Sequence, residues 1–181
     1  MRILKNNVAA VCIDIQERLF PYMHNAYEFQ NRSIKLIKGL KTLNIPVIVT
    51  EQYVKGLGET IPPVKKALGD SYKPLEKSAF SIADDDSVMH EISNATNQEV
   101  ILFGMESHVC VLQSVIDLLE LNYLPIVVED CVSSRFENDK TIAFERVRKE
   151  GAVITTYESI LFELLRESGT EEFKEISKIV K

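Results

Sequence analysis

The stretch LFGMESHVCV, Leu102 to Val111, joins a buried strand to a helix and sets the fold class of the chain. The apolar run Val100–Phe103 stops at Gly104, and a helical pattern follows. The apolar residues on one face of that helix are Val109, Leu112, Val115, Ile116 and Leu119. A strand that passes directly into a helix is the repeating unit of α/β proteins. Cys110 lies where the strand gives way to the helix.

Four further apolar runs have the same character. They are VAAVCIDI (8–15), PVIVT (46–50), LPIVVED (124–130) and GAVITT (151–156). None alternates cleanly with polar residues, which is typical of strands covered on both faces of a parallel sheet. Helical patterns separate most of these runs, at 27–43, 109–121, 138–149 and from 160 onwards. The terminal segment TEEFKEISKIV begins with a Thr cap and an acidic first turn, as helices do.

This order predicts a three-layer α/β/α protein with a doubly wound, mainly parallel sheet of about six strands and a Rossmann-like topology. The segment 51–98 is too long for a plain connection. Within it we expect a functional loop at EQYVKGLGETIPP, a short strand at YKPLEKS and a capped helix at DDDSVMHEI. Because no repeat or linker interrupts the chain, we expect a single domain over residues 1–181.

Composition narrows the classes of partner. The 181 residues carry a net charge of −6 without a basic block, so we expect neither nucleic acid nor an anionic membrane as a partner. No apolar stretch approaches the roughly 20 residues that span a bilayer, and the N-terminus lacks a signal-peptide cleavage site. Three widely spaced cysteines without a CxxC pair argue against a disulfide framework or structural zinc. We therefore expect a cytoplasmic protein.

Polar residues gather where the predicted strands end. The strand ends carry Asp14, 50–52, 104–106, 129–130 and, if YKPLEKS is a strand, Lys77. In an open α/β sheet, ligands bind beyond the carboxyl ends of the strands. A small-molecule site is therefore expected at this edge. No metal or cofactor is expected, because GLGET lacks the GxGxxG pattern and no two histidines lie at ligand spacing.

Cys110 has two interpretations. In the first turn of a helix, the free N–H groups and the helix dipole would lower the pKa of its thiol and could hold an oxyanion. Alternatively, it is a small buried residue that only packs. Cys12, in the middle of a strand, is expected in the core, whereas Cys131 follows a strand end and is a rival nucleophile.

A reactive thiol needs a base. His108 points about 200° away from Cys110 on a helix, His24 is expected in a loop, and His90 is expected on an exposed helix face. Asp14 ends an otherwise apolar strand and is a better candidate base, although Asp is also a common loop cap. Lys77 is either an ordinary solvated lysine or, if it lies near Asp14, the residue that holds this carboxylate.

Five motifs together resemble a known family. CIDIQERLF, VTEQYVKGLG, LEKSAFS, GMESHVCV and VVEDCVSSR follow one another as in isochorismatase-like cysteine hydrolases, over about residues 5 to 165. TEQYVKGLG is most similar to the branch of isochorismatase domain-containing proteins. The resemblance implies a catalytic triad of Asp14, Lys77 and Cys110. It also implies a non-proline cis peptide at Met105–Glu106, which directs the N–H of Glu106 alongside that of Cys110 as an oxyanion hole. Family members usually form homo-oligomers.

Two departures from the family narrow the chemistry. Nicotinamidases carry an Asp and two His as metal ligands in the middle loop, whereas this chain has TEQYVKGLGET without a histidine. True isochorismatases generally lack the cysteine, so Cys110 favours covalent chemistry over isochorismate cleavage.

We therefore expect a hydrolase of unknown small-molecule substrate that cleaves an amide or related C–N bond through a thioester on Cys110. The expected pocket residues are Gln16, Phe20, Gln52, Tyr53 and His108. One alternative is a non-catalytic small-molecule sensor or an oligomeric interaction protein that retains the site. A flavodoxin-like domain is another alternative, although the missing glycine-rich phosphate loop argues against it.

Overall fold

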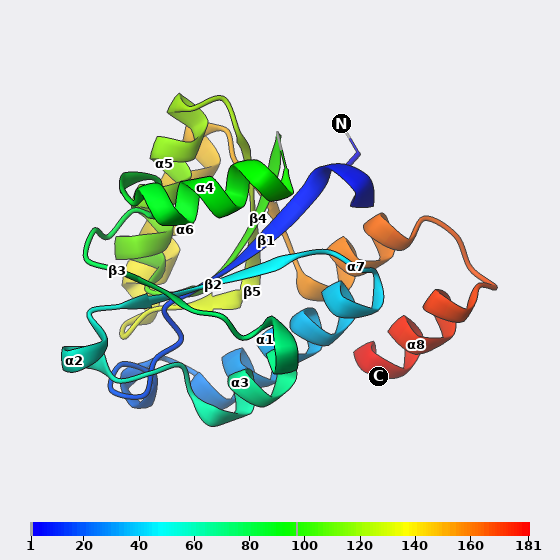
Figure 1. Cartoon of the computed structure of the whole chain (residues 1–181), viewed down its shortest axis with the longest axis horizontal. Coiled ribbons are helices and arrows are strands. Elements are labelled where there is room, and N and C mark those ends of the chain that lie inside the picture. The colour runs from blue at the N-terminus through cyan, green and yellow to red at the C-terminus, as the bar shows by residue number, and fades with distance from the viewer. Residues whose placement is uncertain (1, 97) are drawn as a thin grey trace.

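Six parallel strands form one sheet in the order β3-β2-β1-β4-β5-β6 (Figure 1). The structure is a computed structural model and describes residues 2–96 and 98–181. The strands are β1 (Val8–Ile13), β2 (Val47–Gln52), β3 (Leu75–Lys77), β4 (Glu99–Met105), β5 (Leu124–Ser133) and β6 (Val153–Thr155). The predicted α/β class and the predicted sheet of about six strands are confirmed.

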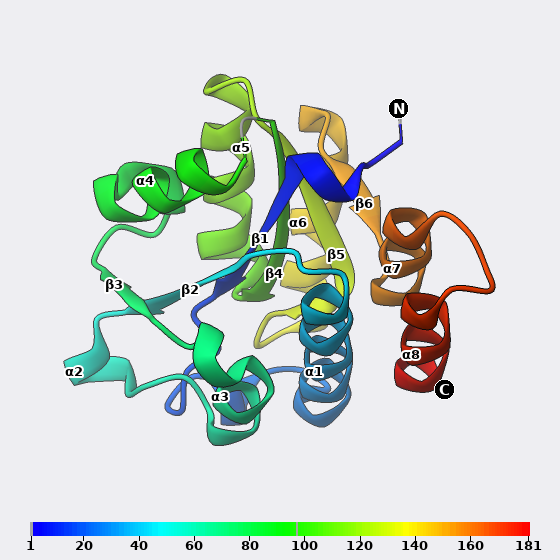
Figure 2. The same cartoon turned by 45° about the vertical axis from the view of Figure 1, so that its right-hand side comes forward.

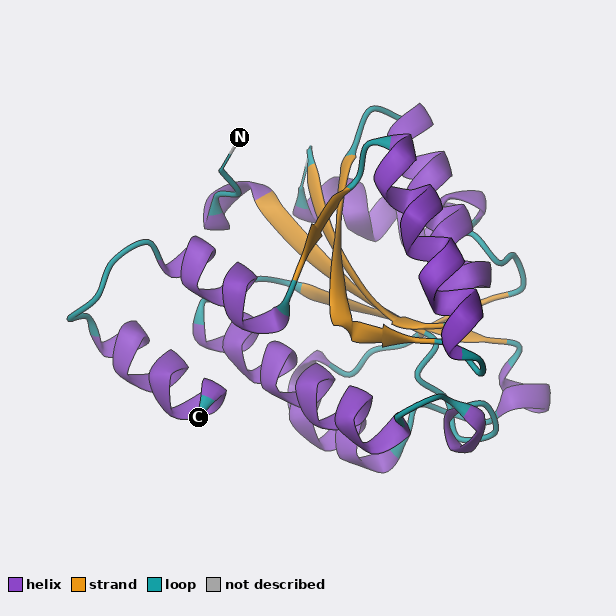
Figure 3. Cartoon of the chain, turned by 180° about the vertical axis from the view of Figure 1, so that it is seen from behind, coloured by secondary structure: helices purple, strands orange, loops and turns teal. Residues whose placement is uncertain are grey.

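Helices cover both faces of this sheet (Figures 2 and 3). The helices are α1 (Ala26–Thr42), α2 (Val54–Leu57), α3 (Pro62–Leu68), α4 (Asp86–Ala95), α5 (Leu112–Glu120), α6 (Glu137–Glu150), α7 (Tyr157–Leu165) and α8 (Glu171–Val180). Helix α1 packs against α3, α7 and α8, while α5 packs against α6 on the opposite face. Within the described ranges, no helix combines the length and apolarity needed to cross a membrane.

The two central strands explain the continuous apolar runs in the sequence. Every residue of β1 and β4 is buried, because helices lie above and below both strands. The register pairs Ile13 with Gly104 and with Thr50, so the carboxyl ends of β1, β2 and β4 meet at one edge. Topology therefore brings together the residues that follow these strands.

The segment between β2 and β4 contains more helix than the sequence indicated. YKPLEKS contains β3 and DDDSVMHEI contains α4, as expected. The expected loop EQYVKGLGETIPP, however, includes α2 and leads directly into α3. The expectation that this stretch is loop throughout was wrong, because Pro62 and Pro63 occupy the first turn of α3, where proline is compatible with a helix.

A buried carboxylate holds this segment against the sheet. Glu51 Oε1 accepts hydrogen bonds from the Thr60 N–H, the Thr60 hydroxyl and the Tyr72 hydroxyl, each at 2.7 Å. Because Glu51 lies in β2, these contacts fix the segment relative to the strand end that leads into it.

Gly104 is required where β4 passes β1. Its φ is +132°, and a Cβ atom there would lie 2.0 Å from the main-chain oxygen of Ile13. We expect Gly104→Ala to lower the free energy of unfolding by at least about 3 kcal/mol, as measured by urea denaturation. Gly151 is the matched control, since it also has a positive φ but nothing lies within 4 Å of its Cβ position. Gly151→Ala should cost only about 1–2 kcal/mol, and equal losses would contradict a steric requirement at Gly104.

Candidate functional site

Asp14 lies directly beyond β1, and Thr50 holds it at two points. The Asp14 N–H donates to the main-chain oxygen of Thr50 at 3.2 Å, and the Thr50 hydroxyl donates to Asp14 Oδ1 at 2.7 Å. Asp14 adopts a left-handed backbone with φ of 52°, which is uncommon for a residue other than glycine. The two contacts with Thr50 fix the direction of its carboxylate.

Lys77 ends β3 and forms a fully buried ion pair with Asp14. Its Nζ donates to Asp14 Oδ2 at 2.8 Å and to Gln52 Oε1 at 2.6 Å. The main-chain oxygens of Ala79 and Phe80 accept further hydrogen bonds from it, at 3.1 and 3.2 Å. The ammonium group therefore has acceptors on every side, as a buried charge requires. The interpretation of Lys77 as a solvated lysine was wrong.

Cys110 completes a chain of contacts at this edge. A π-helical turn, Ser107–Val111, leads into α5 and is closed by a hydrogen bond of 3.2 Å from the Val111 N–H to the Glu106 oxygen. The negative charge of Asp14, the positive charge of Lys77 and the main chain of Glu106 all lie close enough to the Cys110 thiol to shift its pKa. The structure thus brings Asp14, Lys77 and Cys110 together.

The thiol pKa differs from the sequence expectation. The pKa of the Cys110 thiol is raised from 9.0 to about 12. Burial is the larger cause, and the negative charge of Asp14 is the second. Lys77 and the Glu106 N–H act in the opposite direction but do not compensate. The expectation of a lowered pKa was wrong, because burial and the neighbouring carboxylate outweigh the short helical turn. The resting thiol is therefore neutral.

The other two cysteines are core residues. Cys12 is 1% exposed and Cys131 is 0% exposed, whereas Cys110 is 7% exposed. Burial raises the pKa of both Cys12 and Cys131 above the ordinary thiol range. Cys131 therefore lacks the access that a nucleophile needs. The expectation that it follows a strand end was wrong, because β5 continues to Ser133.

The peptide bond between Met105 and Glu106 is cis. The Glu106 side chain is buried and accepts hydrogen bonds on Oε2 from the Arg135 N–H at 3.2 Å and from Arg135 Nε at 3.1 Å. These contacts connect the turn that bears Cys110 to the segment after β5.

Two expected pocket residues support the site from within. Gln16 donates to the main-chain oxygens of Gln52 and Gly58 at 3.0 and 2.6 Å, and its Oε1 accepts from the Gln52 N–H at 2.7 Å. The Gln52 side chain in turn contacts Lys77 and donates to the Ser78 oxygen at 2.7 Å. Both side chains are buried, and their amide groups are engaged with protein atoms.

The other three expected pocket residues lie nearer the surface. Phe20 is partly buried, with its ring 6.5 Å from that of Phe29. Tyr53 is exposed, and His108 is partly exposed with Nδ1 3.0 Å from the Ser134 hydroxyl. A role of these residues in substrate binding stays a prediction.

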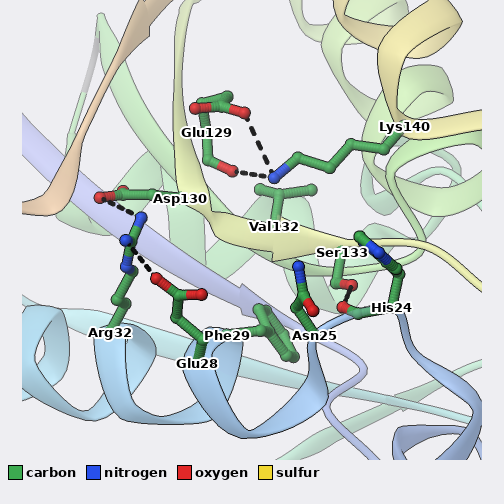
Figure 4. A pocket seen from close by; sticks show the side chains of 10 residues that line it. All are labelled: His24, Asn25, Glu28, Phe29, Arg32, Glu129, Asp130, Val132, Ser133 and Lys140. Atoms are coloured by element: carbon green, nitrogen blue, oxygen red, sulfur yellow. Dashed lines mark hydrogen bonds and ion pairs between the residues drawn. The ribbon is translucent and has the colours of Figure 1, made fainter. Parts of the chain in front are cut away.

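A separate hollow of about 280 Å³ lies between α1, β5 and α6 (Figure 4). Its charged side chains pair with one another, Arg32 with Glu28 and Asp130, and Lys140 with Glu129. None of the triad residues lines it. Glu129 and Asp130 line this hollow. The prediction that a strand ends at 129–130 was wrong, because β5 continues to Ser133.

Metal ligands are not grouped in the described part of the chain. Within residues 2–96 and 98–181, no cluster of three or more His, Cys, Asp or Glu side chains is placed to hold a metal ion. His24 and His90 are both exposed, and His24 lines the separate hollow.

Sequence reasoning missed the role of Thr50 and the contact between Glu106 and Arg135. Thr50 stands at a predicted strand end, as Asp14 does, but nothing in the sequence pairs its hydroxyl with that carboxylate. For Arg135, nothing in the sequence near Glu106 indicates the contact, because 29 residues separate the two.

Known proteins resemble this chain over almost its whole length. The sequence profile of the isochorismatase domain matches residues 8–159. Isochorismatase family protein 1B of Dictyostelium discoideum is 36% identical over 99% of this chain and 89% of its own. The structure of the MAR1 ribonuclease of Caenorhabditis elegans has 38% identity and a TM-score of 0.92, over 99% of this chain and 92% of its own. YcaC of Escherichia coli is described as an octameric hydrolase of unknown specificity. Its structure covers 99% of this chain and 89% of its own, with 21% identity. The TM-score of 0.92 shows that the two proteins share the fold.

The raised thiol pKa predicts a distinctive alkylation profile. With a thiol pKa of about 12, the rate of Cys110 alkylation by iodoacetamide should rise with pH up to pH 10 without reaching a plateau. Intact-protein mass spectrometry would follow the adduct, with Cys110→Ala as the control for the two core thiols. A plateau at or below pH 8 would show that the thiol pKa is lowered instead.

Proposed function

Because this chain belongs to the isochorismatase family, we propose that it is a cysteine hydrolase that cleaves a carboxamide or related C–N bond through a thioester on Cys110. The observation that carries this proposal is the buried series of contacts from Lys77 to Asp14 to Cys110 at one edge of the sheet. The arrangement supplies a nucleophile, a base and a group that fixes the base.

In the first step, the Cys110 sulfur attacks the carbonyl carbon of the amide while Asp14 accepts the thiol proton. Since the thiol pKa is about 12, a free thiolate is rare at neutral pH, and proton transfer accompanies the attack. The C–S bond forms as the carbonyl π electrons move to oxygen. The N–H groups of Glu106 and Cys110 stabilise this oxyanion, a contribution of about 3 kcal/mol per donor.

In the second step, the C–N bond breaks and Asp14 returns its proton to the departing amine. A water molecule then attacks the thioester, with Asp14 accepting its proton. When the carboxylic acid leaves, the sulfur recovers a proton from Asp14. Throughout, Lys77 and Thr50 hold the carboxylate by one oxygen each, so that it faces the sulfur.

RNA is a less suitable substrate than a small molecule. The name of the Caenorhabditis elegans protein refers to RNA cleavage. This chain, however, has a net charge of −6 and no basic block in its sequence, whereas RNA-binding surfaces are basic. The alternative of a small-molecule sensor predicts binding to Cys110 without turnover.

We further propose a single-domain, cytoplasmic homo-oligomer. The three cysteines are free, which suits a reducing compartment. Large exposed side chains, including Tyr22, Tyr27 and Phe136, offer apolar surface for contact between copies. The octameric state of YcaC, a protein with the same fold, is in keeping with such an assembly.

Replacement of the nucleophile tests the proposed function directly. We expect Cys110→Ala to abolish hydrolysis of a panel of small amides and to remove the acyl adduct seen by intact-protein mass spectrometry, with the melting temperature nearly unchanged. Cys131→Ala is the thiol control and should still form the adduct, although it leaves a small cavity. Undiminished hydrolysis in Cys110→Ala would rule out the thioester mechanism.

Replacement of the base tests the role of Asp14. We expect Asp14→Asn to slow acylation of Cys110 at pH 7 by about 10²–10⁴-fold, because no group remains to accept the thiol proton. The same change removes a negative charge that raises the thiol pKa, so the thiolate forms more easily. If Asp14→Asn is acylated more slowly although its Cys110 thiol ionises more easily, the loss is due to the missing base and not to a change in thiol pKa.

Asp86→Asn, at the exposed start of α4, is the charge-matched control for this experiment. It should acylate at the wild-type rate. If Asp14→Asn also acylated at or above the wild-type rate, Asp14 would not be the base.

A further inference from the structure

The Ser107 hydroxyl is buried without a partner. Ser107 is 2% exposed, and among the described residues no group forms a hydrogen bond with its Oγ. Most buried hydroxyl groups in proteins are hydrogen-bonded, since leaving one unpaired costs about 1–3 kcal/mol. An unpaired hydroxyl therefore needs an explanation, and its position in the molecule supplies one.

Ser107 shares its turn with the proposed nucleophile. It begins the π-helical turn Ser107–Val111, which also bears Cys110, and it directly follows Glu106. The main chain of Glu106 lies close enough to the Cys110 sulfur to lower the pKa of the thiol. The hydroxyl therefore belongs to the same turn as both groups that the proposed reaction uses.

Nearby serines in the same region do have partners. The Ser114 hydroxyl donates to the Cys110 main-chain oxygen at 2.6 Å and accepts from the Ile82 N–H at 3.0 Å. The Ser134 hydroxyl lies 3.0 Å from His108 Nδ1. The lack of a hydrogen-bond partner thus distinguishes Ser107 from the other two serines in this part of the fold.

We propose that the Ser107 hydroxyl donates a hydrogen bond to the carbonyl oxygen of the bound amide, as a third donor beside the N–H groups of Glu106 and Cys110. This inference rests on the proposed function. No bond forms or breaks at Ser107, and its hydrogen bond strengthens as the carbonyl oxygen becomes an anion. Because no protein acceptor competes for this hydroxyl, it can turn to the substrate without breaking another contact.

The test compares two reactions of Cys110, of which one passes through an oxyanion. Acylation by p-nitrophenyl acetate forms a tetrahedral oxyanion, whereas alkylation by iodoacetamide displaces iodide at a saturated carbon and forms none. We expect Ser107→Ala to slow acylation by about 10- to 100-fold and to leave the alkylation rate within about twofold of wild type. The melting temperature should stay constant or rise, because the lost hydroxyl had no partner.

Ser33→Ala is the matched control, since Ser33 in α1 has the other buried hydroxyl without a partner among the described residues. It should leave both rates unchanged. Equal losses of acylation and alkylation in Ser107→Ala would indicate a structural role, and unchanged acylation would exclude a donor; either result overturns the inference. Absence of a Cys110 acyl adduct in the wild-type protein would instead refute the proposed function itself, and the inference with it.

Discussion

The buried ion pair between Lys77 and Asp14 is the interaction on which the rest of the site depends. Removing two charges from water is costly, and the cost is offset only when every remaining polar atom is satisfied. Here Thr50, Gln52 and two main-chain oxygens complete the set. Because these groups follow or belong to β1, β2 and β3, the pair is stable only when three strand ends are correctly aligned. Loss of one partner would leave an uncompensated charge, at a cost of about 3–5 kcal/mol.

The same carboxylate has a structural and a chemical role. One Asp14 oxygen accepts from Lys77 and the other from Thr50. Its negative charge raises the thiol pKa and so keeps the sulfur protonated in the resting protein. Since oxidants and metals react with thiolates, a neutral thiol is less exposed to both. Under the proposed mechanism, the thiol loses its proton to Asp14 only as the substrate is attacked.

Local patterns predicted the fold well, because they reflect local physics. Runs of Val and Ile covered on both faces identified the strands of the sheet, and Thr170 caps α8 as the sequence indicated. The short helix α3 was missed because its two prolines also occur in loops. The site depended on distant contacts: 63 residues separate Lys77 from Asp14, and 36 separate Thr50 from it. Only the family resemblance indicated the first contact, and nothing in the sequence indicated the second.

The direction of the Cys110 pKa shift could not be predicted from sequence, because burial depth is a property of the packed molecule. The helix start favours a lower pKa, but desolvation and Asp14 prevail. In the same way, the sequence shows a serine at 107 without showing that its hydroxyl is unpaired.

The segment between β2 and β3 is held largely through its main chain. The Tyr53 N–H donates to the Lys77 oxygen and the Val54 N–H to Glu76, while Arg18 and Gln16 donate to the main-chain oxygens of residues 55–58. Between Tyr53 and Gly58 the chain contributes no side chain to the ion pair. Because main-chain atoms make these contacts, replacements at Val54, Lys55 and Leu57 leave both the segment and the charged centre in place. The surface beside the ion pair can therefore diverge during evolution without rebuilding the pair itself.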